Sequence, residues 1–180
     1  MPSLTKTLRT VALVGCAMLL SGCFHMRARH VLRYYGDSDT GWYQLRFPDG
    51  LVEENKLQEM LAKFRKFSRP TARTTGGRTI IEDLSGAASM EYMYDQYKCT
   101  DSPQPDFVDC RFVLEVTEEV GRMDGWSLAW EVELQPRMRV LTSNHAAVRR
   151  EGNRDILVWS FDGNKVSQAT VAFVVRVPRA

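Results

Sequence analysis

The first 22 residues decide how much of the chain is left to fold. Lys6 and Arg9 precede an apolar run over residues 11–20, which is followed by the small residues Ser21 and Gly22. A membrane-spanning helix needs about 20 apolar residues, so this shorter run predicts a cleaved export signal. Removing 22 of the 180 residues leaves 158, enough for one domain that buries about 70% of the surface of its unfolded chain.

The end of the apolar run, Leu20-Ser21-Gly22-Cys23, resembles the lipobox of bacterial lipoproteins. That resemblance implies cleavage after residue 22, a diacylglyceryl thioether on the sulfur of Cys23 and a fatty acyl group, such as palmitate, on its new amine. Several acyl chains on one residue anchor a protein stably to a membrane, whereas a single chain does not. An ordinary secretory signal with an incidental cysteine is the alternative.

The residue after the lipobox bears on location. In Gram-negative lipoproteins an Asp at this place commonly retains the protein at the inner membrane, and Phe24 stands there in this chain. The resemblance therefore implies an outer-membrane lipoprotein that faces the periplasm. Residues 23–30 hold two Arg and two His, which could contact anionic head groups, but we expect a short solvated tether there. One domain is expected over residues 31–178.

Cysteine usage predicts one disulfide. Cys16 leaves with the signal and Cys23 is expected to be lipidated, so Cys99 and Cys110 remain as a pair in an oxidising compartment. The segment between them is rich in turn-forming residues, and a bridge that closes such a loop contributes about 3 kcal/mol to stability. A redox-active pair is the less favoured alternative, because such pairs usually have Cys-x-x-Cys spacing.

Apolar periodicity in the first half of the domain predicts strands and two helices. Strands are expected at residues 31–35 and 42–47, joined as a hairpin by a cluster of turn formers. Apolar residues three and four positions apart predict a helix over residues 51–67. A short strand is expected at 78–84, and the helical spacing of Met90, Met93, Tyr94 and Tyr97 predicts a second helix within 85–97.

The second half of the domain predicts antiparallel strands. Strands at residues 112–117 and 126–134 are expected to form a hairpin around an Asp-Gly turn. Strands at 155–161 and 166–177 are expected to form the last hairpin. The resulting order, β-β-α-β-α followed by antiparallel strands, predicts the α+β class, with a curved antiparallel sheet packed against one or two helices.

The domain contains no sequence motif for catalysis or metal binding. We find no His-Glu-x-x-His, no Gly-x-Ser-x-Gly and no Walker-type glycine run, so neither an enzyme nor a metal or other cofactor is expected. Loss of the signal removes two of the 24 basic residues and leaves 22, equal to the 22 acidic residues. A domain without net charge is a poor candidate for nucleic-acid binding. The basic residues between 63 and 78 predict either a basic patch or, preferably, a solvated loop.

The domain as a whole resembles the LppM-type lipoproteins of bacteria. The resemblance rests on the β-β-α opening after the lipobox and on the late strand at residues 155–161, whose Trp159 precedes the polar turn at Asp162-Gly163. It implies a compact fold similar to lipid- or lipoglycan-binding domains, with a ligand between helix and sheet. The chain departs from that family in its Cys99/Cys110 pair and in lacking a C-terminal membrane helix.

The leading hypothesis is a non-catalytic, membrane-anchored lipoprotein that binds a lipid or amphiphilic ligand or assists envelope assembly. Apolar pockets usually hold such ligands, and the residues expected to line this one are Leu57, Leu61, Phe64, Trp126, Trp130 and Trp159. The main alternative is a protein–protein interaction module of an envelope complex. An envelope hydrolase built around His145 is a third possibility. A hollow between helix and sheet favours ligand binding, and a flat, fully packed sheet favours a protein partner.

Overall fold

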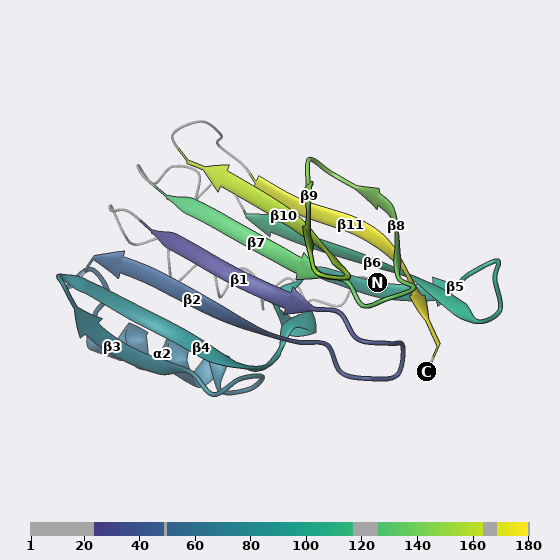
Figure 1. Cartoon of the computed structure of the whole chain (residues 1–180). Helices are drawn as coiled ribbons and strands as arrows, with labels where there is room; N and C mark the ends of the chain where they lie inside the picture. The colour runs from purple at the N-terminus through teal and green to yellow at the C-terminus, as the bar shows by residue number, and fades with distance from the viewer. Residues whose placement is uncertain (1–23, 49, 117–125, 164–168, 180) are drawn as a thin grey trace, which may run out of the picture.

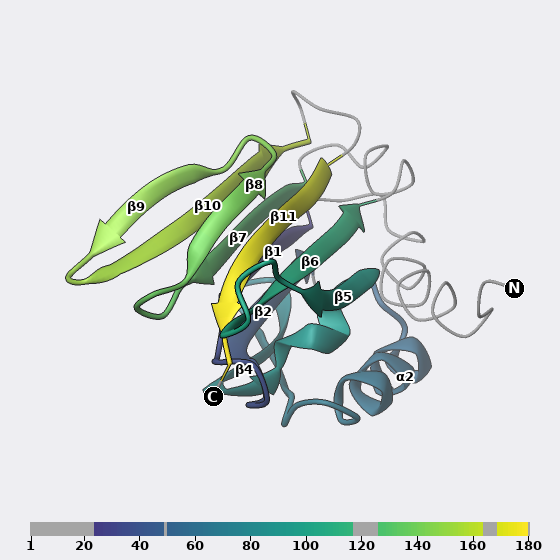
Figure 2. The same cartoon turned by 90° about the vertical axis from the view of Figure 1, so that its right-hand side faces the viewer.

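The computed structural model describes residues 24–48, 50–116, 126–163 and 169–179. The export signal, Cys23 and the expected Asp-Gly turn before residue 126 lie outside the described residues. Two β-sheets, one α-helix and one short 3-10 helix make up the regular structure of the described part. The helix and the smaller sheet lie next to each other on the same face of the larger sheet (Figures 1 and 2).

The larger sheet has seven strands in the order β3-β4-β2-β1-β7-β10-β9. Their bounds are β1 His25–Val31, β2 Thr40–Pro48, β3 Thr71–Thr75, β4 Arg78–Ser89, β7 Ser127–Glu133, β9 Ala147–Glu151 and β10 Arg154–Asp162. All neighbours in this sheet are antiparallel except β1 and β7, which are parallel. The sheet is therefore mixed, and β1 is its middle strand with partners on both sides.

The second layer combines a small sheet with the helix. The sheet has four antiparallel strands in the order β5-β6-β11-β8. The bounds in this layer are α2 Glu54–Phe64, the 3-10 helix η1 Met90–Met93, β5 Gln96–Asp101, β6 Phe107–Val116, β8 Arg139–Ser143 and β11 Ala169–Pro178. Met60, Leu61 and Phe64 form the buried stripe of α2, as its three- and four-residue spacing predicts.

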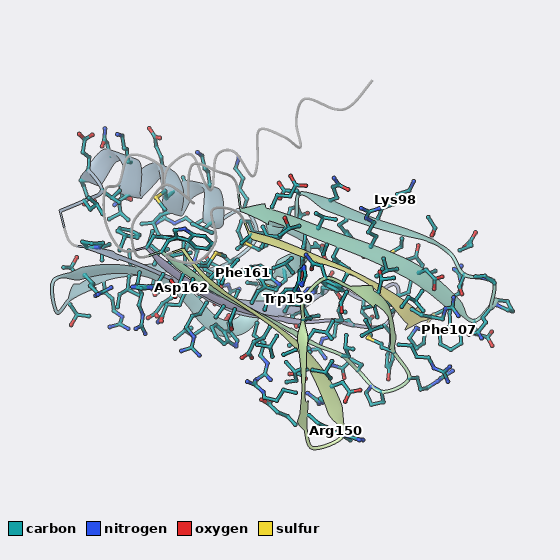
Figure 3. All side chains as sticks on the ribbon, turned by 90° about the horizontal axis from the view of Figure 1, so that it is seen from above. Lys98, Phe107, Arg150, Trp159, Phe161 and Asp162 are labelled. Atoms are coloured by element: carbon teal, nitrogen blue, oxygen red, sulfur yellow. A yellow bond between two sulfur atoms is a disulfide. The ribbon has the colours of Figure 1, made fainter. Side chains whose placement is uncertain are left out.

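Aromatic side chains fill the space between the two layers. The Tyr43 ring of β2 stacks on Phe64 of α2 with centroids 4.9 Å apart. Under the small sheet, Phe173 of β11 stacks on Phe112 at 4.7 Å and lies 5.4 Å from Trp159 of β10. Viewed from above, Trp159 lies between the two sheets, whereas Arg150 lies at the end of the projecting β9–β10 hairpin (Figure 3). One continuous core therefore joins both sheets and the helix.

The start of the fold differs from the expectation. Residues 25–30, expected to belong to a solvated tether, form most of β1, and the described domain begins before residue 31. Met26 and Ala28 are buried, while the residues between them face the other side of the sheet. This alternation has the period of a half-buried strand. The charged residues of this segment favoured its interpretation as a polar tether instead of a strand.

The prediction of a second α-helix within residues 85–97 is wrong. β4 continues to Ser89, η1 makes a single turn, and β5 begins at Gln96. The methionines and tyrosine that suggested the helix, Met90, Met93 and Tyr94, are buried in the core. A single 3-10 turn is enough to bring Met90 and Met93 to the same side, because 3-10 residues three apart eclipse one another, and Tyr94 follows directly in an extended conformation. The helix expected over 51–67 exists, but spans only Glu54–Phe64.

The predictions of two hairpins in the second half of the domain are also wrong, because the strands expected to pair lie in different sheets. β6 pairs with β5 and β11, whereas β7 pairs with β1 and β10. β10 and β11 likewise lie in different sheets. The chain thus crosses between layers at both points, and the fold is α+β but predominantly β.

The predicted disulfide is confirmed. Cys99 of β5 and Cys110 of β6 lie directly opposite each other in the small sheet and are bonded. None of the helices in the described segments is long and apolar enough to span a membrane.

Candidate functional site

The six residues expected to line an apolar pocket lie in or against the hydrophobic core. Five of them are almost fully buried: Leu61, Phe64, Trp126, Trp130 and Trp159. Leu57 is partly buried against the core. The indole N–H of Trp130 donates to the hydroxyl of Tyr94 (3.0 Å) and that of Trp159 donates to the carbonyl of Asn144, whereas the buried indole nitrogen of Trp126 has no hydrogen-bond partner among the described residues. Neither of the two hollows described below is lined by any of the six.

The larger hollow lies on the outer face of the seven-stranded sheet, the face turned away from α2 and the small sheet. Its volume is about 500 Å³, and it is lined by His25, Arg27, Gln44, Arg46, Arg78, Ser127 and Ala129. We call it the basic hollow. It lies where β1 and β7 begin and where β2 ends, at the left of the sheet in Figure 1.

Strand register assembles the basic hollow. His25 of β1 is opposite Arg46 of β2 on one side and Ser127 of β7 on the other. Two residues further along β1, Arg27 is opposite Gln44 and Ala129. Residues two apart in a strand share a face, so all of these point outward. The small side chains on β7 leave space beside the long ones on β1 and β2, which creates the depression.

The hollow contains several positive groups and no carboxylate in its lining. The Arg46 guanidinium donates from Nε to the amide oxygen of Gln44 (2.7 Å), and Nδ1 of His25 lies 2.7 Å from the Ser127 hydroxyl. Arg27 and Arg78 are both exposed, and within the described part of the chain their guanidinium groups form no ion pair. Their positive charge is therefore available to an anion.

The field of these groups acts on His25. Partial burial lowers the pKa of its imidazole below the usual 6.5, and the nearby positive charges of Arg78 and Arg46 lower it further. Nearby positive charges disfavour the protonated imidazole, so this shift indicates that positive charge is concentrated around His25. An anion bound in the hollow would relieve that repulsion.

The part of the same face that follows the hollow along β1 is internally neutralised. Arg29 lies 2.7 Å from a carboxylate oxygen of Glu151 and 3.5 Å from those of Glu131 and Glu133. Arg149 pairs with Glu131 and Glu151, and a further arginine on β10 pairs with Glu133.

Beside the hollow, Glu82 of β4 lies opposite Gln44 and accepts hydrogen bonds from the Gln44 amide and from Arg73. One part of the outer face is thus compensated, whereas Arg27 and Arg78 at the hollow form no ion pair among the described residues.

A second, smaller hollow is acidic. Its volume is about 330 Å³, and residues 32–39 of the β1–β2 connection, Glu91 and Tyr97 supply much of its lining. Burial and the charge of Asp39 raise the pKa of Glu91, while burial, followed by the charges of Asp39 and Glu91, raises the pKa of Tyr97 to about 12. This negative surround disfavours an anionic ligand.

Sequence reasoning missed the basic hollow. His25 and Arg27 were assigned to a tether, and nothing linked them to Arg46 or Arg78. The alternation of residues 25–30 could have indicated a strand with a basic face. The meeting of three strands at one place depends on sheet order, which no local pattern encodes.

Two other expectations concerned metals and His145. Among the described residues, no group of three or more His, Cys, Asp or Glu side chains could hold a metal ion. His145, the centre of the hydrolase alternative, is exposed in the turn between β8 and β9 and has a left-handed backbone with φ of 50°.

Comparison of the sequence with protein-family models and with curated proteins finds no match. Comparison with solved structures finds a similar fold in the folded domain of LppM from Mycobacterium tuberculosis, determined by NMR. The TM-score is 0.50 at 13% sequence identity, and the match covers 88% of this chain and 92% of the LppM domain. At this identity the likeness shows the fold alone: the chain has a fold similar to that of the LppM folded domain, as the sequence resemblance implied.

Proposed function

We propose that this protein is a lipoprotein anchored through acyl chains on Cys23 to the outer membrane, facing the periplasm. We further propose that its domain binds the anionic head group of an amphiphilic ligand without catalysing a reaction. The anchoring rests on the lipobox sequence Leu20-Ser21-Gly22-Cys23. The binding rests on one observation: the basic hollow brings His25, Arg27, Arg46 and Arg78 together with no carboxylate in its lining.

The chemistry of the hollow fits a phosphate. A guanidinium group offers a planar fork of N–H donors that matches phosphate oxygens, and charge-assisted hydrogen bonds of this kind are about twice as strong as neutral ones. Arg27 on β1 and Arg78 on β4 lie on the two sides of β2, which carries Arg46 and Gln44, and Ser127 on β7 adds a hydroxyl on the far side of β1. The volume of about 500 Å³ lies within the usual range of ligand sites, roughly 300–1,000 Å³.

The proposed ligand site lies on the outer face of the large sheet and differs from the site expected from the sequence. The ligand was expected between helix and sheet, where Phe64, Trp130 and Trp159 are at most 1% exposed. Entry there would require the core to open. The outer face requires no such rearrangement, so the head group is the part of an amphiphile that the described structure can receive directly.

A protein-interaction module remains the second candidate, because the sheet edges are open. Every residue of the edge strands β3 and β9 is exposed, and Val148 of β9 is 66% exposed. An unpaired edge can accept a strand from another protein. Arg149 and Arg150 on β9 oppose indiscriminate pairing, since charged residues protect edge strands.

Native mass spectrometry of the lipidated full-length protein, extracted in mild detergent, would test the proposed function. We expect an anionic phospholipid to be retained and recovered by solvent extraction. A triple variant, R27Q/R46Q/R78Q, should lose it. The matched control R111Q/R139Q/R150Q removes three exposed arginines from β6, β8 and β9 and should retain it. Equal retention by both variants would contradict the proposal.

A further inference from the structure

We infer that the basic hollow docks the domain onto the membrane leaflet that carries its own anchor, by holding a phosphate of an anionic phospholipid in that leaflet. The outer face of the seven-stranded sheet then lies toward the membrane at the end where β1 begins. This inference rests on the proposed anchoring at Cys23 and on the proposed binding of an anionic head group, and it adds the source of that head group and the orientation of the domain.

The first step is that very few residues separate the proposed anchor at Cys23 from the first strand of the domain. β1 begins at His25, two residues after Cys23. A fully extended chain spans at most about 3.6 Å per residue, so the Cα atoms of these residues lie within about 7 Å of each other. Acyl chains on Cys23 would hold that residue at the membrane surface. His25, which itself lines the hollow, is then held in the head-group region.

The second step is that β1 cannot act as a flexible spacer. It pairs along its whole length, residues 25–31, with β2 on one side and with β7 on the other. A strand in the middle of a sheet cannot detach without breaking both ladders. The anchor is therefore attached to the rigid sheet itself, and the end of the sheet that holds the hollow stays near the lipid surface.

The third step is the distribution of charge over the outer face. Near the anchor, Arg27, Arg46 and Arg78 line a hollow without carboxylates. Away from it, Arg29 and Arg149 are compensated by Glu131, Glu133 and Glu151. Electrostatic attraction is screened over about 8 Å at physiological salt, so only groups close to the surface take part. Arg27 and Arg78, which form no ion pair among the described residues, lie at the end that the anchor brings within this range.

Charge complementarity selects the occupant. Basic residues close to an anionic leaflet each strengthen association by roughly fivefold. The phosphate of an anionic phospholipid has no cationic group beside it in the head group, whereas the phosphate of a zwitterionic lipid such as phosphatidylcholine is offset by one. A protein partner would have to enter between the domain and the membrane to reach the same arginines. The geometry thus points to a lipid of the anchoring leaflet.

Arginine footprinting of the lipidated full-length protein in vesicles tests this inference. The protein is reconstituted into vesicles of phosphatidylcholine alone or with added phosphatidylglycerol and treated with phenylglyoxal, and the modified peptides are quantified by mass spectrometry. We expect Arg27, Arg46 and Arg78 to react about fivefold more slowly in the anionic vesicles. Arg139 and Arg150, on β8 and β9, should react equally in both and serve as internal controls.

A second measurement separates this inference from the proposed function. Short-chain phosphatidylglycerol below its micellar concentration is added to the detergent-solubilised protein, and the same arginines are footprinted. Protection by the short-chain lipid without protection in anionic vesicles would overturn the docking and leave head-group binding intact. Protection in neither experiment would overturn both. Protection in both, with the control arginines unchanged, is the result that the inference requires.

Discussion

The imidazole Nε2 of His30 lies 3.1 Å from a carboxylate oxygen of Asp39, and the His30 side chain is completely buried. The contact has the distance of an ion pair but not the angle of a straight hydrogen bond. On the other side of the ring, Nδ1 lies 2.8 Å from the Tyr94 hydroxyl, which accepts the indole N–H of Trp130. Since Trp130 can only donate, the Tyr94 hydroxyl is free to donate to His30. This chain of polar contacts links the β1–β2 connection to the core between the sheets.

The variant Asp39→Ala should lower the free energy of unfolding by about 3 kcal/mol, because removing one member of a buried polar pair leaves its partner without compensation. It also removes the acceptor of the Arg33 backbone N–H (2.8 Å). Urea unfolding followed by tryptophan fluorescence measures the change. The exposed neighbour Asp37 provides the control, since Asp37→Ala should change stability by no more than about 0.5 kcal/mol. Equal effects of the two variants would contradict a structural role for the pair.

The disulfide between Cys99 and Cys110 should contribute about 3 kcal/mol to stability, because it closes a short loop and restricts the unfolded chain. The double variant Cys99→Ser/Cys110→Ser should therefore unfold at a lower urea concentration than the oxidised protein. Wild-type protein kept in a reducing agent should move to the same midpoint. If reduction left the wild-type midpoint unchanged, the bond would not contribute to stability.

Gly41 should not tolerate a side chain. A Cβ placed there would lie 2.1 Å from the carbonyl oxygen of Arg29 and 2.5 Å from Cγ of Met90. The first of these atoms belongs to the backbone of β1 and cannot move without disturbing the sheet. Gly41→Ala should cost about 2 kcal/mol or more, in the range of overpacked cores, and a thermal melt by circular dichroism would show it. An unchanged melting temperature would contradict the close approach.

Binding to anionic vesicles should strengthen as the pH falls. Burial, together with Arg78 and Arg46, holds the pKa of His25 below 6.5 in the free domain, so the unfolded chain takes up this proton first. His25 therefore lowers the stability of the free domain as the pH drops through 6.5. A bound phosphate favours the imidazolium and raises its pKa, so binding takes up a proton and affinity increases toward low pH.

Co-sedimentation with phosphatidylglycerol vesicles between about pH 8 and pH 5 would measure this dependence. The variant His25→Gln should lose the part of the pH dependence that comes from this residue. A matched control is His145→Gln, which changes an exposed histidine in the β8–β9 turn and should leave the profile unchanged. An identical profile for wild type and His25→Gln would contradict a role for His25 in the hollow.

Features with a strong local signal were predictable. The alternation of residues 126–134 predicted β7, and the stripe containing Leu61 and Phe64 predicted α2, although its ends lie at Glu54 and Phe64. The even pair Cys99 and Cys110 predicted the disulfide. Each of these depends on side chains near one another in the sequence, or on chemistry that only one pairing can satisfy.

Features with conflicting local signals were not predictable. The strand His25–Val31 was not predicted, because its charged residues are typical of both polar tethers and half-buried strands. Buried methionines at three-residue spacing suggested a helix where the chain makes a single 3-10 turn, Met90–Met93. In both cases tertiary contacts decided between two local structures that the same residues can adopt.

The sequence by itself determined the α+β composition, the positions of most strands, the disulfide and the likeness to LppM-type domains. Only the tertiary structure decided that β1 is the middle strand of its sheet and that consecutive strands such as β6 and β7, or β10 and β11, lie in different sheets. It also decided that His25, Arg27, Arg46 and Arg78 share one hollow. The physical reason is that strand pairing joins backbone groups far apart in the chain. Its register is set by how all apolar faces are buried together, so no single segment carries that information.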